Sequence, residues 1–163
     1  VLDAVAKLAD WGSRLPPGHG MGVALSHSFG SYAAEVAHVS VDDTGSLRVE
    51  GLWCAIDCGL YVNPSIVERQ MQSAMVYGLT AVLTGKIDFK DGAVVQSNFH
   101  DYPALGMTQT PPMHVHIVQS DNDPGGYGEP GLPTLAPAVT NAIFAATGKR
   151  IRRLPLSDQD LRV

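Results

Sequence analysis

The sequence predicts an α+β fold in which mostly antiparallel strands pack against two long helices. Apolar residues recur at helical spacing after Asn63-Pro64 and again after residue 131, over stretches long enough for long helices. The rest of the chain is dominated by short runs rich in β-branched residues, and many of these runs end at turns that contain glycine. We therefore expect a sheet built largely from hairpins and covered by two helices.

Length and composition indicate one domain. The chain has 163 residues, of which 45% are hydrophobic, and we expect residues 1–163 to form a single domain. The formal net charge of −5 argues against a nucleic-acid surface, because binding a polyphosphate requires a basic face. No apolar run reaches the length of about 20 residues that a membrane-spanning helix needs.

The chain begins at Val1 and not at a methionine, which indicates a piece of a longer protein. Signals that direct a protein to its compartment usually lie at the N-terminus of the complete chain. The sequence therefore leaves the compartment undetermined, with a bacterial cytoplasm and a periplasm both open.

The first half of the chain predicts one helix and three strands. Residues 1–11 form the expected helix, and Gly12 ends it. Strands are expected from about residue 20 to 29, over 31–42 and over 47–58, with a hairpin turn at 42–45. The apolar positions that predict the first helix are Val1, Leu2, Val5, Leu8 and Trp11.

The second half opens with the clearest helix signal. Asn63 has the side chain of an N-cap, and Pro64 suits the first helical position, so a helix is expected from there to about Gly85. A hairpin over 86–98 should turn at Asp91-Gly92. The apolar residues that share one face of the predicted helix are Val67, Met71, Ala74, Met75, Gly78, Leu79 and Val82.

The remaining segments are a long loop, a short strand, a second loop and a helix. Residues 100–112 are polar and irregular, 115–120 suit a short strand, and 121–131 are rich in turn residues. The last helix should start around 133–137 and run to about Thr147, because Gly148 and the basic Lys149 are typical of a helix C-terminus.

The loop before the last helix is the most informative stretch. Four glycines fall within residues 125–131, and glycine lets a backbone approach a ligand closely. Glu129 lies among them without a cation nearby in sequence, just ahead of the positive end of the helix. A carboxylate in a partly dry, glycine-lined pocket suits a general base. The alternative is that Glu129 only caps the helix.

Other polar residues are weaker candidates. Cys54 and Cys58 fall in a predicted strand and are expected to be buried thiols, because a metal site needs further ligands. His114 and His116 should share one face of a strand, a possible metal pair with no third ligand nearby. His100-Asp101-Tyr102 resembles part of a catalytic triad, but the sequence has no Gly-x-Ser-x-Gly motif.

Three motifs carry a family resemblance, and they cover nearly the whole chain in family order. They are Ser28-Phe29-Gly30-Ser31-Tyr32 through Val39, Ile56-Asp57-Cys58-Gly59 through Asn63-Pro64 to Gln70, and Gly126-Tyr127-Gly128-Glu129-Pro130-Gly131 with the sequence to Leu156. They resemble the C-terminal part of the molybdopterin-binding subunit in the xanthine oxidase family of molybdenum hydroxylases. Within that family the chain is most similar to the isoquinoline 1-oxidoreductase and aldehyde dehydrogenase types.

The resemblance implies a cofactor and roles for particular residues. The cofactor is molybdenum bound to molybdopterin cytosine dinucleotide, with iron–sulfur clusters on a partner subunit. Glu129 matches the catalytic base, Gln70 matches a glutamine whose amide contacts the cofactor, and the backbone at Gly126, Tyr127 and Gly128 would lie near the metal. None of these residues is expected to ligate the metal. Gln72 is a second candidate for the glutamine.

The implied activity is oxidation of an aldehyde or an N-heterocycle, with water as the oxygen source. The family assembles its site from several segments, most of them N-terminal to the part matched here. We therefore expect residues 1–163 to fold by themselves but to be inactive without the remainder of the parent chain. The alternative is a scaffold or interaction module that retains the fold without the chemistry. The substrate and the electron acceptor are not determined by the sequence.

Overall fold

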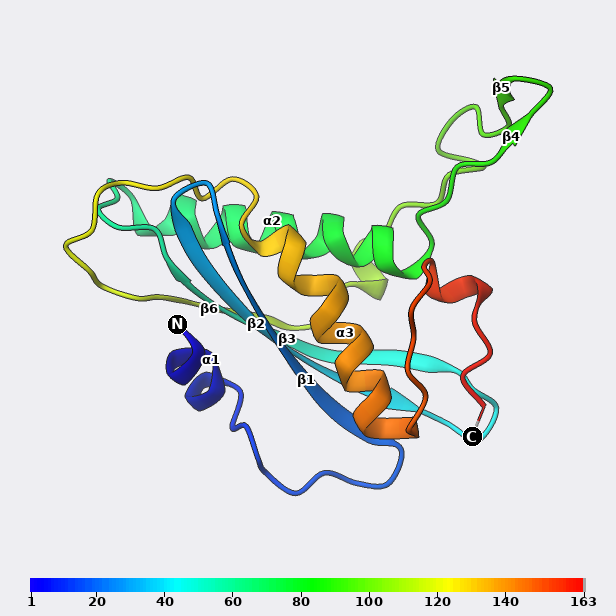
Figure 1. Cartoon of the computed structure of the whole chain (residues 1–163), viewed down its shortest axis with the longest axis horizontal. Coiled ribbons are helices and arrows are strands. Elements are labelled where there is room, and N and C mark those ends of the chain that lie inside the picture. The colour runs from blue at the N-terminus through cyan, green and yellow to red at the C-terminus, as the bar shows by residue number, and fades with distance from the viewer. Residues whose placement is uncertain (163) are drawn as a thin grey trace.

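A computed structural model describes residues 1–162 and shows one mixed sheet with strand order β1-β2-β3-β6 (Figure 1). The strands are β1 His19–Ser28, β2 Ser31–Val41, β3 Leu47–Asp57 and β6 Met113–Ile117. The first three pair antiparallel in sequence order, and β6 pairs parallel to β3. The predicted α+β class, with mostly antiparallel strands and two long helices, is confirmed.

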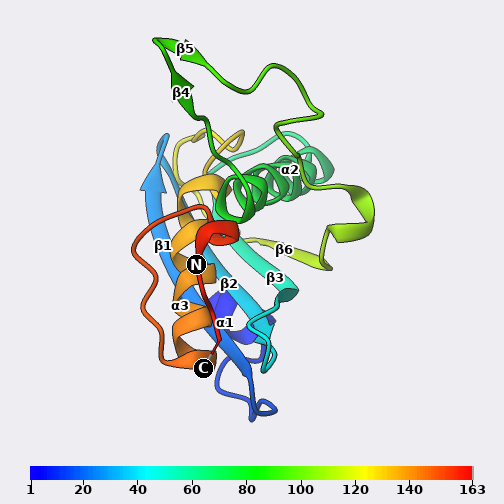
Figure 2. The ribbon, with the colours of Figure 1, turned by 90° about the vertical axis from the view of Figure 1, so that its right-hand side faces the viewer.

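The sheet is covered on both faces (Figures 1 and 2). The helices α2 (Pro64–Leu83) and α3 (Gly131–Thr147) pack on one face, over alternate residues of β2 and β3 such as Val39 and Ile56. The short helix α1 (Leu2–Leu8) packs on the other face, where Val5 meets Val36. Alternation along β2 therefore divides its side chains between two separate core clusters.

The helix α2 forms as its sequence predicts. The Asn63 side chain accepts a hydrogen bond from the Ser65 N–H at 3.0 Å, and Pro64 is the first helical residue. The predicted apolar face is confirmed, because the buried residues of α2 are Val67, Met71, Ala74, Met75, Gly78, Leu79 and Val82.

The helix α3 crosses β1 at very close range. A Cβ atom on Gly22 would lie 2.2 Å from the Ala138 carbonyl oxygen, and one on Gly20 would lie 2.4 Å from that of Ala142. Side chains at these positions would push the helix off the sheet. The helix starts at Gly131, earlier than the predicted start around 133–137, and ends as predicted at Gly148, which has φ 74°.

Two predicted elements differ from the structure. The first helix covers Leu2–Leu8 and not residues 1–11, and Leu2, Leu8 and Trp11 are exposed, because this face of the sheet offers a contact surface only around Val5 and Ala9. The strand predicted over 115–120 covers Met113–Ile117, where the backbone reaches the edge of β3.

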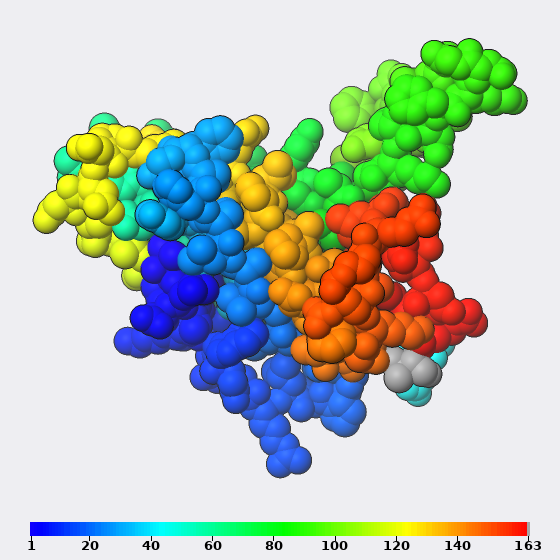
Figure 3. All heavy atoms as spheres, viewed as in Figure 1, coloured from blue at the N-terminus to red at the C-terminus, as the bar shows by residue number. Residues whose placement is uncertain are grey.

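Residues 86–110 form a projecting segment, which we call the arm (Figures 1 and 3). It contains the two-residue strands β4 (Phe89–Lys90) and β5 (Ala93–Val94), which turn at Asp91-Gly92 as predicted, and the 3-10 turn Met107–Gln109. A second 3-10 turn follows α3 at Leu156–Asp158. None of the helices within residues 1–162 has the length and apolar character that crossing a membrane requires.

Candidate functional site

The glycine-rich loop is tied to the sheet by bonds from two remote segments. The Gly126 N–H donates to the Phe29 carbonyl at 2.8 Å, and the Ser31 hydroxyl donates to the Gly126 carbonyl at 2.7 Å. The Gly125 N–H donates to the Cys58 carbonyl, also at 2.8 Å. Parts of the three motifs that carry the family resemblance, namely the β1–β2 turn, the end of β3 and the glycine-rich loop, therefore meet at one end of the molecule, opposite the arm (Figure 3).

Asp57 ties the same end of the molecule from a second side. Its carboxylate accepts hydrogen bonds from the Ser120 hydroxyl at 2.6 Å, the Gly59 N–H at 3.0 Å and the Asn122 amide at 3.2 Å. The Ser120 hydrogen bond is the largest cause that lowers the pKa of Asp57 below its ordinary value. The end of β3 and the start of the glycine-rich loop are thus held by one charged group.

Two glycines in this region are required by close contacts. A Cβ on Gly125 would lie 2.3 Å from the Ser31 hydroxyl, and a Cβ on Gly59, where φ is 65°, would lie 2.2 Å from the Asp123 carbonyl oxygen. Neither position has room for a side chain. The glycines therefore allow the loop to lie directly against the β1–β2 turn and the end of β3.

Gln70 on α2 lies beside the loop. Its amide nitrogen is 3.9 Å from the place that a Cβ of Gly128 would occupy, with no other heavy atom closer. Residues two apart on a helix point in nearly opposite directions. Accordingly, the Gln72 amide is directed toward Glu68 at 3.4 Å, and Gln72 lines an apolar hollow of about 510 Å³ between α2 and the arm.

Glu129 is exposed, so residues 1–162 do not by themselves form the partly dry pocket expected around this side chain. Its backbone carbonyl accepts the Leu132 N–H at 2.9 Å. The N-cap position of α3 is Pro130, and no side chain caps this helix. The Glu129 carboxylate is therefore not used as a helix cap and is free to face a ligand.

The backbone around Glu129 offers hydrogen-bond donors. The N–H groups of Tyr127, Gly128 and Glu129 have no acceptor within residues 1–162, and the N-terminus of α3 follows directly. Successive free N–H groups at the start of a helix suit an anionic, polar ligand. The Gln70 amide beside Gly128 adds a further hydrogen-bonding group to this surface. The Tyr127 side chain packs against the core cluster.

The histidine and cysteine candidates lie outside this region. His114 and His116 are exposed on the same face of β6, as predicted, and His114 stacks on Trp53 with ring centroids 5.8 Å apart. Cys54 and Cys58 are free and buried, and burial raises the pKa of both thiols. Residues 1–162 contain no group of three His, Cys, Asp or Glu side chains placed to hold a metal ion.

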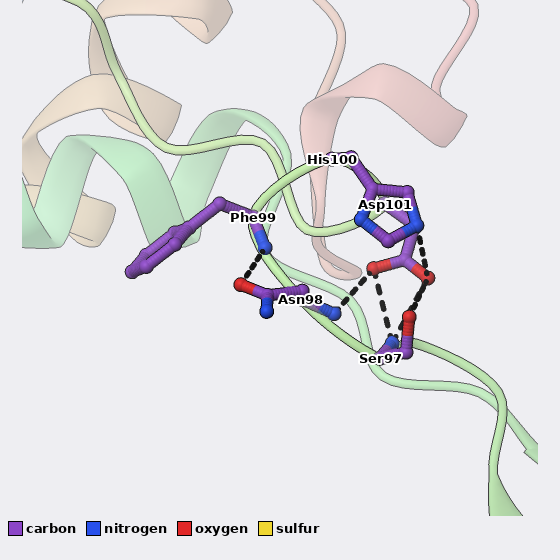
Figure 4. Close-up of polar contacts among 5 residues, drawn as sticks. All are labelled: Ser97, Asn98, Phe99, His100 and Asp101. Atoms are coloured by element: carbon purple, nitrogen blue, oxygen red, sulfur yellow. Dashed lines mark hydrogen bonds and ion pairs between the residues drawn. The ribbon is translucent and has the colours of Figure 1, made fainter.

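Two of the triad-like residues, His100 and Asp101, lie in a turn of the arm with Ser97 and Asn98 (Figure 4). The Asp101 carboxylate accepts from the Ser97 hydroxyl at 3.0 Å and from the Asn98 N–H at 2.9 Å, while His100 lies 3.6 Å from the same carboxylate. A hydrolytic triad needs the imidazole between the acid and the nucleophile. Here the carboxylate lies between the hydroxyl and the imidazole, so the group stabilises a turn.

One residue of this region was missed in the sequence. Glu35 lies on β2, on the face covered by α2 and α3, and is 1% exposed. Its Oε1 atom lies 3.0 Å from the place that a Cβ of Gly131 would occupy. Strand alternation places Glu35 on the same face as Ala33 and Ala37, but it does not show that this face is covered, so the sequence carried no signal for a buried acid here.

The fold and these contacts define an α+β domain whose glycine-rich loop, strand ends and α2 meet at one edge. The molybdopterin cofactor-binding domain family matches residues 14–111, and the chain belongs to that family. The resemblance to xanthine oxidase family molybdenum enzymes is confirmed by this match and by the relatives that follow.

The isoquinoline 1-oxidoreductase beta subunit of Brevundimonas diminuta is 37% identical over 96% of this chain and 20% of that protein. The membrane-bound aldehyde dehydrogenase of Gluconacetobacter polyoxogenes is 32% identical over 99% of this chain and 22% of that protein. The aldehyde oxidoreductase of Desulfovibrio gigas has a similar structure, with a TM-score of 0.67 at 28% identity over 77% of this chain and 14% of that one. The chain thus spans about a fifth of the length of these two curated relatives.

Proposed function

We propose that this chain is the C-terminal segment of the molybdopterin-binding subunit of a molybdenum hydroxylase, in which it supplies the general base and part of the cofactor site. The observation that carries the proposal is the convergence of Gln70, Gly128 and Glu129 at one edge of a molybdopterin cofactor-binding domain. The Glu129 carboxylate is exposed, caps no helix and lies beside backbone N–H groups that have no acceptor. Within residues 1–162 it therefore makes no contact that stabilises the fold.

In the complete enzyme, the Gln70 amide and the N–H groups of Gly126, Tyr127 and Gly128 lie against the cofactor, although Gly126 already donates to Phe29 and contributes mainly by close approach. The bound molybdenum cofactor supplies the redox chemistry. Glu129 accepts a proton from the water that provides the oxygen atom of the product. The N-terminus of α3 follows this carboxylate directly in the chain.

The substrate of the complete enzyme is an aldehyde or an N-heterocycle, the two classes that the names of the similar proteins indicate. Oxidation with water releases two electrons and two protons for each oxygen atom transferred. Glu129 takes one of these protons, and the electrons pass to an iron–sulfur partner subunit. The cytosine dinucleotide is the form of the cofactor that the family resemblance favours.

The test is Glu129→Gln in the complete enzyme. Glutamine retains the shape and reach of the side chain but cannot accept the proton. Turnover should fall by about 10²–10⁴-fold, the usual contribution of a positioned acid or base, while molybdenum content stays unchanged. Glu68→Gln, at an exposed glutamate of α2, is the matched control and should retain turnover.

The scaffold alternative predicts a different pattern. If the chain retains only the fold, Glu129→Gln and Glu68→Gln should have equal turnover within about threefold, and the proposal would be abandoned. A variant that loses its molybdenum along with its turnover would contradict the assigned role, because a base acts in the transition state and not in cofactor binding.

A further inference from the structure

Glu35 is a buried acid with no partner that explains it. Neither of its carboxyl oxygens makes a hydrogen bond within residues 1–162. The Thr134 hydroxyl lies close enough to lower the pKa of the carboxyl, although by less than burial raises it. In the structure this hydroxyl is directed to the Gly131 carbonyl at 3.5 Å, which is long for a hydrogen bond, so it does not pair with the carboxyl. Burial of an unpaired polar group is costly, so a glutamate at this place needs a reason.

The surroundings of Glu35 keep the carboxyl neutral. Its neighbours across the sheet are Ala24 on β1 and the buried Cys54 thiol on β3. No cation among the described residues faces it, and burial raises the pKa of the carboxyl well above its ordinary value. An ionised carboxylate here would be an unpaired buried charge, which proteins avoid by retaining the proton.

The carboxyl lies directly under the first turn of α3. Gly131 is confined between Glu35 on the sheet side and α2, where Ala74 and Met71 also lie within 3.6 Å of its missing Cβ position. Only Pro130 separates Gly131 from Glu129. The position of Glu129 relative to Gln70 therefore depends on the distance between this helical turn and the sheet. The Glu35 side chain fills the space between them.

We propose that Glu35 is a positioning residue of the site, whose buried carboxyl supports Gly131 from the sheet side and thereby sets the place of Glu129. The proposal rests on the proposed function of Glu129. It adds that the loop is supported by a polar side chain and not by the apolar packing that surrounds it. Glutamine is neutral and has nearly the same shape, so it should support Gly131 as the carboxyl does. Alanine is too short to do so.

The first measurement needs no turnover. In the complete enzyme, hydrogen exchange of the segment 125–134 should become about tenfold faster in Glu35→Ala and stay within about twofold in Glu35→Gln. Val36→Ala is the matched control, since Val36 is the next residue, is equally buried, and faces α1 on the opposite side of the sheet. It should leave exchange in 125–134 unchanged relative to the rest of the sheet.

The second measurement is turnover per bound molybdenum. It should fall about tenfold in Glu35→Ala with KM within about threefold, because a base that is slightly misplaced loses rate more than binding. Glu35→Gln should restore it. The proposal is overturned if Glu35→Ala leaves exchange of 125–134 unchanged, or raises it only as much as across the whole sheet. If exchange responds but Glu129→Gln retains turnover, the proposed function fails and the support by Glu35 stands.

Discussion

The two ends of the molecule carry exposed, glycine-containing loops that are held in different ways. The glycine-rich loop is bonded to residues far away in sequence, such as Ser31 to Gly126 across 95 positions. The arm is bonded mainly within itself, as between Ser97 and Asp101, four positions apart. Its base is attached to the end of α2, where the Leu105 N–H donates to the Thr80 hydroxyl and the Thr84 hydroxyl donates to the Pro103 carbonyl, each at 3.1 Å. Lys86, also at the base, forms an ion pair with Asp158 at 3.2 Å.

This difference indicates which end can support chemistry. A loop that is bonded to two remote segments of the sheet cannot move unless the sheet also opens, so its residues keep their relative places. The hydrogen bonds around the tip of the arm are local, so we expect the tip to rearrange without opening the sheet. Its apolar side chains are largely exposed, with Phe99 at 82% and Met107 at 95%. The candidate site therefore belongs to the glycine-rich loop, which is rigid although it is exposed.

The largest difference between the two ends should appear when alanine replaces glycine. Gly125→Ala forces a Cβ against the Ser31 hydroxyl and the Gly30 carbonyl, and should cost about 2–3 kcal/mol of unfolding free energy. Gly92→Ala, at the tip of the arm, has free space but a φ of 79°, and should cost about 1 kcal/mol. Denaturant unfolding of the purified chain measures both. Equal costs would show that the two loops are equally constrained.

A second prediction concerns the acid beneath the loop. The pKa of Glu35 is raised in the folded chain, so the folded state holds its proton over a pH range in which the unfolded state has released it. The wild-type chain therefore loses stability as pH rises above the ordinary value of 4.5, by up to about 1.4 kcal/mol per pH unit until the carboxyl ionises in the folded state.

Glu35→Gln removes this loss. The variant should unfold at a higher temperature than wild type at pH 7. Near pH 4 the two should be similar, because the Glu35 carboxyl is then largely protonated in the unfolded chain as well as in the folded chain. Thermal midpoints from pH 4 to pH 8 make the comparison. A constant difference between the two chains over that range would mean that Glu35 is not buried in neutral form.

The smallest difference between the two ends should appear when alanine replaces a hydrogen-bonding carboxylate, Asp57 beside the glycine-rich loop or Asp101 in the arm. Asp57→Ala removes hydrogen bonds from the Gly59 N–H, the Ser120 hydroxyl and the Asn122 amide. It should lower the free energy of unfolding by about 1–2 kcal/mol. Because the pKa of Asp57 is lowered in the folded state, its contribution is present above the ordinary value of 3.8 and is lost as pH falls through the folded value.

Asp101→Ala is the matched change in the arm. The pKa of Asp101 is lowered as well, but its hydrogen bonds are local, so the midpoint of the whole chain should not change measurably. Hydrogen exchange of residues 96–102 should increase instead. A global loss of stability in Asp101→Ala would show that the arm folds together with the core.

Local rules in the sequence determined most of the elements. Asn63-Pro64 has the side chains that start a helix, the apolar spacing defines its buried face, and Asp91-Gly92 favours a tight turn whatever surrounds it. Such features depend on neighbours within a few residues, which is why the predicted boundaries of α2 and the hairpins agree with the structure. The family motifs likewise identified the class of cofactor before any contact was known.

Only the tertiary structure decided which remote residues are in contact and which side chains are buried from solvent. The parallel pairing of β6 with β3, the approach of Gln70 to Gly128 and the exposure of Glu129 depend on segments remote in sequence. Glu35 shows the reason most clearly. Its place on β2 follows from alternation, but whether that face is covered depends on α3, which begins 96 positions later, at Gly131. Burial is a property of the packed assembly, and no local pattern contains it.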